Sequence, residues 1–157
     1  MNLPRALLAG AFGGIVASVV MAVARRLGAD LPLEILVGTV VLDPGPGAWA
    51  LGFAVHVAGS AVIGLAYAWG FEVITKRATM LSGAVLSVIH LLGSGVAVGA
   101  VLPAVHPLVP EAVAAPGFFF ARLGAGAVVA YGLAHLVFGA AVGALYRNQV
   151  RRPRLTA

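Results

Sequence analysis

The amino-acid sequence predicts an all-α membrane protein, an antiparallel bundle of four transmembrane helices. Hydrophobic residues make up 61% of the 157-residue chain and charged residues only 10%, whereas soluble domains carry about 25% charged residues. Four stretches contain no Asp, Glu, Lys or Arg: residues 6–24, 44–71, 78–110 and 123–146. Each is long enough to cross a bilayer, which takes about 20 residues. The absence of cysteine excludes disulfides, thiolate chemistry and cysteine-held metal clusters.

The four crossings are predicted as helices at about residues 3–24, 48–71, 79–102 and 119–146. The first helix also fits a secretory signal, because residues 22–24 form a small-residue cleavage pattern after an apolar run. Against the signal, the run is long and is followed at once by Arg25 and Arg26. We therefore expect this segment to be the first of four crossings.

The two loops on the predicted outer side are longer than tight turns. Within residues 27–47, the apolar run 31–41 predicts a short helix that lies on or dips into the membrane interface. Residues 103–117 contain four prolines and so cannot form one regular helix. Aromatic residues expected to mark the membrane interfaces are Trp49, Trp69, Phe118, Phe119 and Phe120.

Basic residues near the helix ends predict which side of the membrane each loop occupies, because they resist translocation. One side is predicted to carry Arg5, Lys76, Arg77, Arg147, Arg151, Arg152 and Arg154. The other side carries Arg25, Arg26 and Arg122. We therefore expect a multi-pass protein of the cytoplasmic (inner) membrane with both termini in the cytoplasm. The basic tail, residues 147–157, is expected to contact anionic lipid head groups, and the net charge of +5 needs no nucleic-acid partner to explain it.

An internal repeat relates the second and fourth predicted helices at an offset of 79 residues. The pattern His-x7-Gly-x2-Tyr occurs twice, pairing His56 with His135, Gly64 with Gly143 and Tyr67 with Tyr146. The same offset places Gly14 on Gly93. The chain is therefore predicted to be a single transmembrane domain of two tandem helical hairpins, about residues 1–77 and 78–150, in one orientation.

Each repeated helix carries small and polar residues at four-residue spacing, which places them on one face. The two stripes are Gly52, His56, Ser60 and Gly64, and Tyr131, His135, Gly139 and Gly143. The first and third helices offer partner surfaces at Gly10, Gly14, Gly83, Ser87, Gly95 and Gly99. Small residues let helix backbones approach closely in lipid, so we expect these glycines to serve bundle packing rather than a ligand.

Three histidines, His56, His90 and His135, are predicted to lie near the middle of the membrane, where polar residues are costly and often functional. They could be neutral hydrogen-bonding groups between helices, with Ser60, Ser94 and Tyr131 as partners. A second interpretation is a haem b held by His56 and His135. A third is a zinc or copper site that also uses His90. A fourth is a proton or substrate path, although no carboxylate is predicted to accompany the histidines at that depth.

No catalytic motif is present: the chain has no intramembrane Asp pair, Gly-x-Ser-x-Gly, His-Glu-x-x-His or phosphate-binding glycine loop followed by Lys. We therefore expect a non-enzymatic protein. Polar residues of the outer loops are Asp30, Glu34, Asp43, His106, Glu111 and Arg122. They are expected to be solvated, with ion pairs at the outer mouth or a weak cation site as alternatives, and His106 is expected to be an ordinary surface residue.

The glycine-rich segment 6–24 and the two helices 56–67 and 135–146 resemble those of small uncharacterised bacterial and archaeal four-helix integral membrane proteins. The resemblance covers nearly the whole chain and implies no particular activity. A looser resemblance is to four-helix b-type cytochromes. Those with two haems carry two histidines on each of two helices, whereas His56 and His135 are one on each, so this resemblance implies at most one haem.

The expected function is that of a small integral membrane subunit or accessory protein of a larger membrane complex. Its mid-membrane histidine pair is expected to stabilise the bundle or to hold a cofactor. The expected partners are the lipid bilayer and other membrane subunits or further copies of the chain. The alternatives are a haem b-binding electron-transfer subunit and a small transporter or metal- or proton-conducting protein.

Overall fold

The computed structural model describes residues 1–109 and 114–146, and within these ranges the chain is all-helical, without strands. The predicted basic tail and Glu111 lie outside the described residues. The elements are α1 (Leu3–Arg26), α2 (Leu33–Gly38), α3 (Pro46–Gly70), η1 (Phe71–Thr75), α4 (Met80–Val96), η2 (Ala97–Val101), α5 (Leu102–Val105), η3 (Phe118–Leu123) and α6 (Ala125–Tyr146). Four continuous helical segments are long and apolar enough to cross a membrane, as expected of a multi-pass membrane protein. We call these segments rods; they consist of α1, of α3 with η1, of α4 with η2 and α5, and of α6.

The long helices begin at capping residues that the sequence provides. The Asn2 side chain accepts a hydrogen bond from the backbone N–H of Arg5, and Pro4 occupies the first turn of α1, where its missing N–H costs nothing. Thr79 and Ser82 form a reciprocal capping box at the start of α4. These caps supply acceptors for N–H groups that would otherwise lack a partner at the helix ends.

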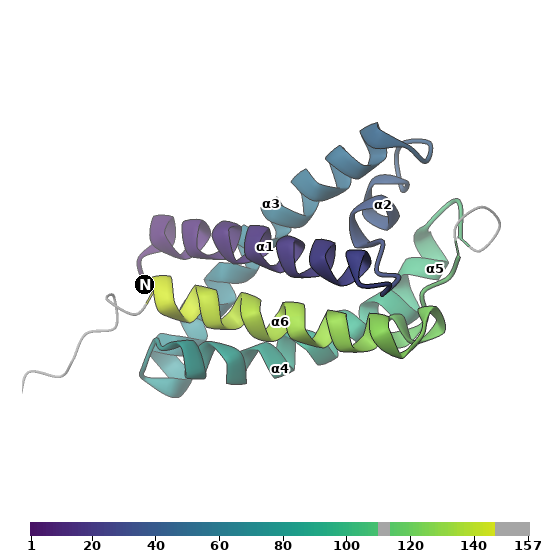
Figure 1. The fold of residues 1–157 in the computed structure, drawn as a ribbon. Helices are drawn as coiled ribbons and strands as arrows, with labels where there is room; N and C mark the ends of the chain where they lie inside the picture. The colour runs from purple at the N-terminus through teal and green to yellow at the C-terminus, as the bar shows by residue number, and fades with distance from the viewer. Residues whose placement is uncertain (110–113, 147–157) are drawn as a thin grey trace, which may run out of the picture.

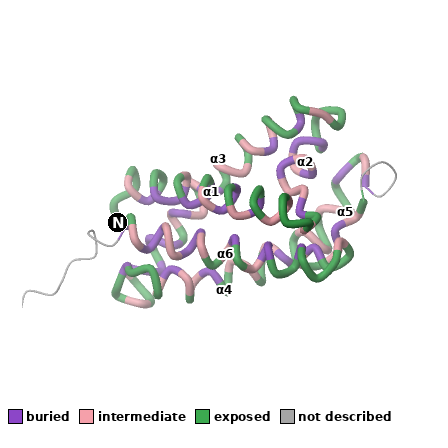
Figure 2. Tube along the Cα trace, viewed as in Figure 1, coloured by how far each residue is buried: buried purple, intermediate pink, exposed green. Residues whose placement is uncertain are grey.

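Helices α1 and α6 lie side by side in the middle of the bundle, with α3 packed against α1 and α4 against α6 (Figure 1). The buried faces follow this order, since purple segments run along α1 and α6 in Figure 2. Within the most apolar 18-residue stretch of each helix, 44% of the residues are buried in α1 and 39% in α6. The corresponding shares are 22% in the α3 rod and 11% in the α4 rod. The outer helices α3 and α4 therefore leave most of their surface uncovered.

Glycines set the closest helix crossings. A Cβ atom added at Gly10 would lie 2.3 Å from the carbonyl oxygen of Ser60, and one added at Gly64 would lie 2.3 Å from that of Ala6. The α4–α6 crossing is equally tight, since a Cβ at Gly83 would lie 1.9 Å from the Gly139 oxygen. At these positions only glycine permits the observed approach.

The structure gives Gly14 and Gly93, which the sequence offset paired, different surroundings. A Cβ at Gly14 would lie 2.5 Å from the Ser60 Cβ, whereas one at Gly93 would meet no atom within 4 Å in the part of the chain that the structure describes. On α4 it is Ser87 that lies against a stripe glycine, 2.8 Å from a Cβ added at Gly139. Gly93 therefore does not occupy the place on α4 that Gly14 occupies on α1.

Both described chain ends meet the α3–α4 connection at one end of the bundle (Figure 1). The backbone N–H of Asn2 donates to the Tyr146 hydroxyl at 3.0 Å, and that hydroxyl donates to Oε1 of Glu72 in η1. The Arg5 side chain donates to the Leu145 carbonyl at 2.7 Å. The start of α1, the end of α6 and the turn after α3 are thus tied together.

The last long helix begins at Ala125, not near residue 119 as predicted. Phe119 and Phe120 have φ angles of 54° and 61°, which a continuing helix excludes. Their backbone turns the rings inward: Phe120 is fully buried, and the Phe119 ring would lie 2.1 Å from a Cβ added at Gly95. The expected aromatic belt is therefore wrong for these two residues, whereas Phe118, Trp49 and Trp69 are about half exposed.

The α4 rod runs on to Val105 through Pro103, beyond the predicted end at residue 102. A proline inside a regular helix clashes with the carbonyl four residues earlier. Here the wider turn η2 precedes α5, and Pro103 lies in the first turn of α5, where no intrahelical N–H is needed. The widened turn thus lets the rod pass a residue that was expected to end it.

Candidate site: a histidine cluster in the centre of the bundle

The structure brings His56 of α3, His90 of α4 and His135 of α6 around one cavity of about 30 Å³. The His90 and His135 rings are in edge contact, with centroids 4.7 Å apart. The remaining lining residues are Ala17, Met21, Leu33, Ser60, Tyr131, Ala134 and Phe138. The three candidate residues singled out from the sequence therefore form one cluster, contributed by three different helices.

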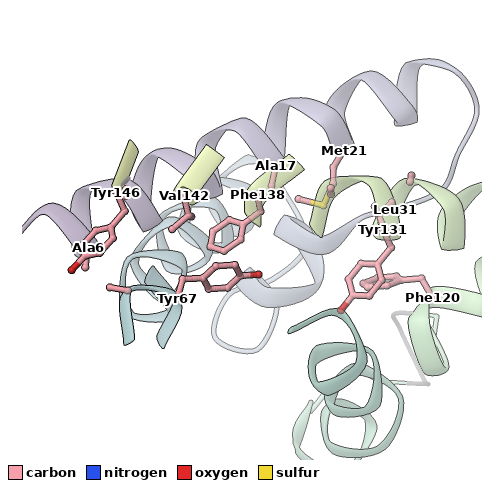
Figure 3. Close-up of a cluster of buried hydrophobic side chains, with 14 of the residues drawn as sticks. Ala6, Ala17, Met21, Leu31, Tyr67, Phe120, Tyr131, Phe138, Val142 and Tyr146 are labelled. Atoms are coloured by element: carbon pink, nitrogen blue, oxygen red, sulfur yellow. The ribbon is translucent and has the colours of Figure 1, made fainter. Parts of the chain in front are cut away.

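Aromatic side chains enclose this cluster along the bundle. Figure 3 shows Tyr67 beside Phe138, and Tyr131 beside Phe120 further along, with Met21 between the two groups. The Tyr67 and Phe138 centroids are 5.3 Å apart, and those of Phe120 and Tyr131 are 5.1 Å apart. Phe138 also contacts the His90 ring and Tyr131 contacts the His135 ring, with centroids 5.4 and 4.4 Å apart, so aromatic rings pack directly against two of the three histidines.

His135 has both ring nitrogens engaged. Its Nδ1 lies 2.9 Å from the Tyr131 carbonyl and its Nε2 lies 2.9 Å from Ser94 Oγ. A carbonyl can only accept, so the neutral ring donates from Nδ1 and leaves Nε2 as an acceptor facing the Ser94 hydroxyl. Ser94 Oγ accepts from the Tyr131 hydroxyl at 2.6 Å, and its single proton is shared between His135 Nε2 and the His90 carbonyl, to which Ser94 Oγ donates at 2.8 Å. This network joins α4 to α6.

Of the predicted hydrogen-bond partners, Tyr131 bonds His135 through its backbone carbonyl, and Ser94 bonds a different histidine ring from the one predicted. Its position one turn after His90 predicts that Ser94 bonds the His90 ring. Instead, the Ser94 hydroxyl contacts the ring of His135 and only the backbone carbonyl of His90. The His90 ring instead has its Nδ1 3.5 Å from the Tyr67 hydroxyl, a long contact. Spacing within one helix could not predict which ring Ser94 bonds, because that contact runs between helices.

His56 differs from the other two histidines. Its Nε2 is buried and has no hydrogen-bond partner among the described residues. Ser60, one turn later and lining the same cavity, has no recorded hydrogen bond within the described part of the chain. His56 therefore lines the cavity with one ring nitrogen that has no hydrogen-bond partner among the described residues.

Glu34 is the residue that sequence reasoning placed wrongly. It was expected among solvated loop charges, yet its side chain is only 1% exposed, and Oε2 pairs with Arg25 at 2.9 Å. Its other oxygen, Oε1, has no partner within the described residues. The same Arg25 nitrogen donates to the Leu31 carbonyl at 2.8 Å. The expectation that Glu34 is a solvated loop charge is therefore wrong.

The burial of Glu34 follows from the way α2 enters the bundle. Figure 1 places α2 between α1 and α3 where the two long helices diverge. A Cβ at Gly52 would lie 1.7 Å from the Glu34 carbonyl oxygen, and one at Gly38 would lie 1.7 Å from that of Ala48. Gly38 and Gly52 thus let two backbones touch. The stripe residue Gly52 was a usable signal, but its partner was not evident from the sequence.

His106 is also buried, at 3% exposure, and not a surface residue as expected. Its Nε2 lies 2.9 Å from the Leu36 carbonyl and 3.1 Å from Thr39 Oγ1, and its Nδ1 accepts from the Leu108 N–H at 3.1 Å. These contacts attach the loop after α5 to the end of α2. His106 thus has a structural role away from the central cluster.

The cluster does not fit a haem held by His56 and His135. Both nitrogens of His135 are already hydrogen-bonded, and a cavity of about 30 Å³ has room for a water molecule, not a macrocycle. In the ranges that the structure describes, no group of three or more His, Asp or Glu side chains is placed to hold a metal ion. The arrangement instead suits hydrogen bonding and small neutral molecules.

Comparison with known proteins adds no relative to this description. No family model, curated protein or solved structure matches the chain. Its function is therefore argued from its own residues.

Proposed function

We propose that the chain is a non-enzymatic, multi-pass integral membrane protein that serves as a small accessory subunit of a larger membrane assembly. The observation that carries the proposal is the uncovered surface of α3 and α4. Two glycines on this surface, Gly59 and Gly93, are exposed, and a Cβ at either would meet no atom of the described residues within 4 Å. Glycine weakens a helix by about 1 kcal/mol relative to alanine, and no contact among the described residues explains why glycine occupies these two positions.

The proposed architecture is a membrane bundle of two tandem hairpins with both termini in the cytoplasm. The two hairpins have matching contacts, since a Cβ at Gly64 would meet the Ala6 oxygen at 2.3 Å and one at Gly143 would meet the Thr79 oxygen at 2.1 Å. The joined chain ends and the basic residues on that side support the orientation. The tail, residues 147–157, is proposed to lie against anionic lipid head groups of the inner membrane.

Within the bundle, the histidine cluster is proposed to stabilise helix association. Interhelical hydrogen bonds in membranes contribute about 0.6–2 kcal/mol each. The Tyr131–Ser94–His135 network links the end of α4 to α6. This use of a buried histidine needs no cofactor.

Extraction in a mild detergent tests the subunit proposal. The expected particle contains the 15.8 kDa chain in a complex with other membrane proteins or with further copies of itself. Gly93→Leu and Gly59→Leu should dissociate the complex while leaving the helix content intact, because leucine favours helix and open space surrounds both positions. Val85→Leu, at another exposed position of α4, is the matched control. A wild-type protein that is monomeric would refute the proposal.

A second candidate function is the passage of a proton or small solute through the bundle. The observation favouring it is the buried carboxylate of Glu34 on α2, whose chain neighbour Leu33 lines the central cavity together with His56. Carboxylate–histidine sets inside membranes commonly mark proton or substrate pathways. The test is flux across vesicles containing the purified chain, with His56→Leu as the inactive variant. Equal flux in empty vesicles would exclude this candidate.

A further inference from the structure

The central cavity has the size and the chemistry of a binding site for one very small molecule. A space of about 30 Å³ exceeds the roughly 10–15 Å³ that one water molecule needs. His56 Nε2 is buried without a partner among the described residues, and such atoms normally have a protein or water partner. Ser60, from the same helix face, also borders the space. The cavity therefore has at least two groups able to hold a hydrogen-bonding occupant.

The charges around the cavity favour a neutral occupant. From α1 the lining residues are Ala17 and Met21, from α2 Leu33, from α3 His56 and Ser60, from α4 His90, and from α6 Tyr131, Ala134, His135 and Phe138. None is a carboxylate, a lysine or an arginine. The nearby Glu34 already forms an ion pair with Arg25, so a cation would have no uncompensated charge to meet. Burying an ion without a partner is costly, whereas a neutral molecule needs only hydrogen bonds.

One side of the cavity lies next to a groove on the protein surface. His90 borders both the cavity and an apolar groove of about 220 Å³ between α3 and α4. The groove is lined mainly by aliphatic side chains, including Ile63, Leu86 and Ile89. A neutral molecule can cross such a groove to reach His90, while an ion would have to shed its hydration there.

We propose that this cavity binds one neutral, water-sized hydrogen-bonding molecule, either water or ammonia, with His56 Nε2 as its principal partner. The site goes beyond the proposed accessory role and does not depend on it, because every group involved belongs to this one chain. It also assigns a use to the His56 Nε2 atom, which is buried without a hydrogen-bond partner among the described residues.

Nuclear magnetic resonance of the full chain in lipid bilayers, with ¹⁵N-labelled histidine, tests this site. We expect magnetisation transfer from a slowly exchanging water to the His56 ring in the wild type. Ala134→Val, which fills the cavity from α6, should abolish that transfer. Ala130→Val is the matched control, because Ala130 is equally buried one turn earlier on α6 but does not line the cavity. Ser60→Ala, which only removes a hydroxyl, should weaken the transfer and keeps the test valid if Ala134→Val does not fold.

Ammonia is distinguished from water by adding ¹⁵N-ammonium chloride at alkaline pH. A new transfer from the labelled nitrogen to His56, with loss of the water signal, identifies ammonia as the ligand. An unchanged water signal identifies water. Absence of any transfer to His56 in the wild type means an empty cavity and overturns the proposal. Because the isolated chain is observed, this outcome is separate from whether the protein forms a larger complex.

Discussion

The alanine variant of Gly83 gives the most direct test of the packing argument. A Cβ at this position of α4 would lie 1.9 Å from the carbonyl oxygen of Gly139 and 3.2 Å from the backbone nitrogen of Gly143. The obstructing atoms are backbone, so no side-chain rotation relieves the clash. Reaching an ordinary contact of 3.4 Å requires α4 and α6 to separate by about 1.5 Å at the crossing.

The cost of that separation can be estimated in two parts. Overpacking a well-packed site costs about 1–3 kcal/mol, and stretching the Ser94–His135 hydrogen bond, which joins the same two helices further along, adds about 1 kcal/mol. The gain in helix propensity from Gly83→Ala returns about 1 kcal/mol. We therefore expect Gly83→Ala to lower the free energy of unfolding by about 2 kcal/mol. Gly93→Ala, on the same helix but with open space around it, should raise that free energy by about 0.5–1 kcal/mol.

Equilibrium unfolding in mixed micelles, followed by the fluorescence of the two tryptophans and by circular dichroism, measures both variants. The same glycine-to-alanine substitution at two positions of one helix should then change the free energy of unfolding in opposite directions. If Gly83→Ala is as stable as the wild type, or if the two variants shift the unfolding midpoint in the same direction, the close α4–α6 crossing is refuted. Size-exclusion chromatography of both proteins checks that the comparison is made on the same oligomeric state.

Three further variants and one spectrum probe the polar contacts. Ser94→Ala removes the bridge to His135 and should lower the free energy of unfolding by about 1–2 kcal/mol in the same assay. His106→Ala should speed amide hydrogen exchange in α2 while leaving the α4–α6 protection unchanged, because its ring is bonded to the end of α2. Arg25→Ala leaves the Glu34 carboxylate buried without its ion pair and should cost about 3–5 kcal/mol, and replacing both residues by methionine should recover most of this. A dithionite-reduced visible spectrum should show no haem bands, and stoichiometric bands lost in a His135 variant would contradict the hydrogen-bond assignment.

Much of the helical framework could be predicted from the sequence because charge and apolar length fix it. The four uncharged stretches gave the four long helical rods, and α1 and α4 begin within a residue of the predicted starts. The predicted short helix in residues 31–41 is present as α2. The errors fall where backbone conformation is local and unusual: the positive φ angles of Phe119 and Phe120 end a helix that composition alone would extend.

The site could be predicted only in part, for a different physical reason. Period-four spacing identified His56 and His135 as inward-facing, and all three histidines do line one cavity. The polar partners come from other elements, however, and sequence spacing carries no information about which helix faces which. Ser94 therefore bonds the ring on α6 and not the ring one turn before it on α4.

Glu34 shows how such an error changes the functional argument. A carboxylate four residues after Asp30, in a loop between two predicted crossings, is expected to be hydrated, and burying it alone would be very costly. The cost is offset because α2 reaches the backbone of α3 at Gly52, which brings Glu34 within 2.9 Å of Arg25 at the end of α1. Gly38, Gly52 and Arg25 thus hold a buried carboxylate on α2, whose neighbour Leu33 lines the same cavity as His56. The Glu34 oxygen Oε1 and the His56 nitrogen Nε2 are both buried without a hydrogen-bond partner among the described residues, and of the two residues His56 lines the cavity whereas Glu34 does not. A double-mutant cycle between Glu34→Gln and His56→Leu measures whether they act together: coupling above about 0.5 kcal/mol supports one shared site, and additive effects would separate them.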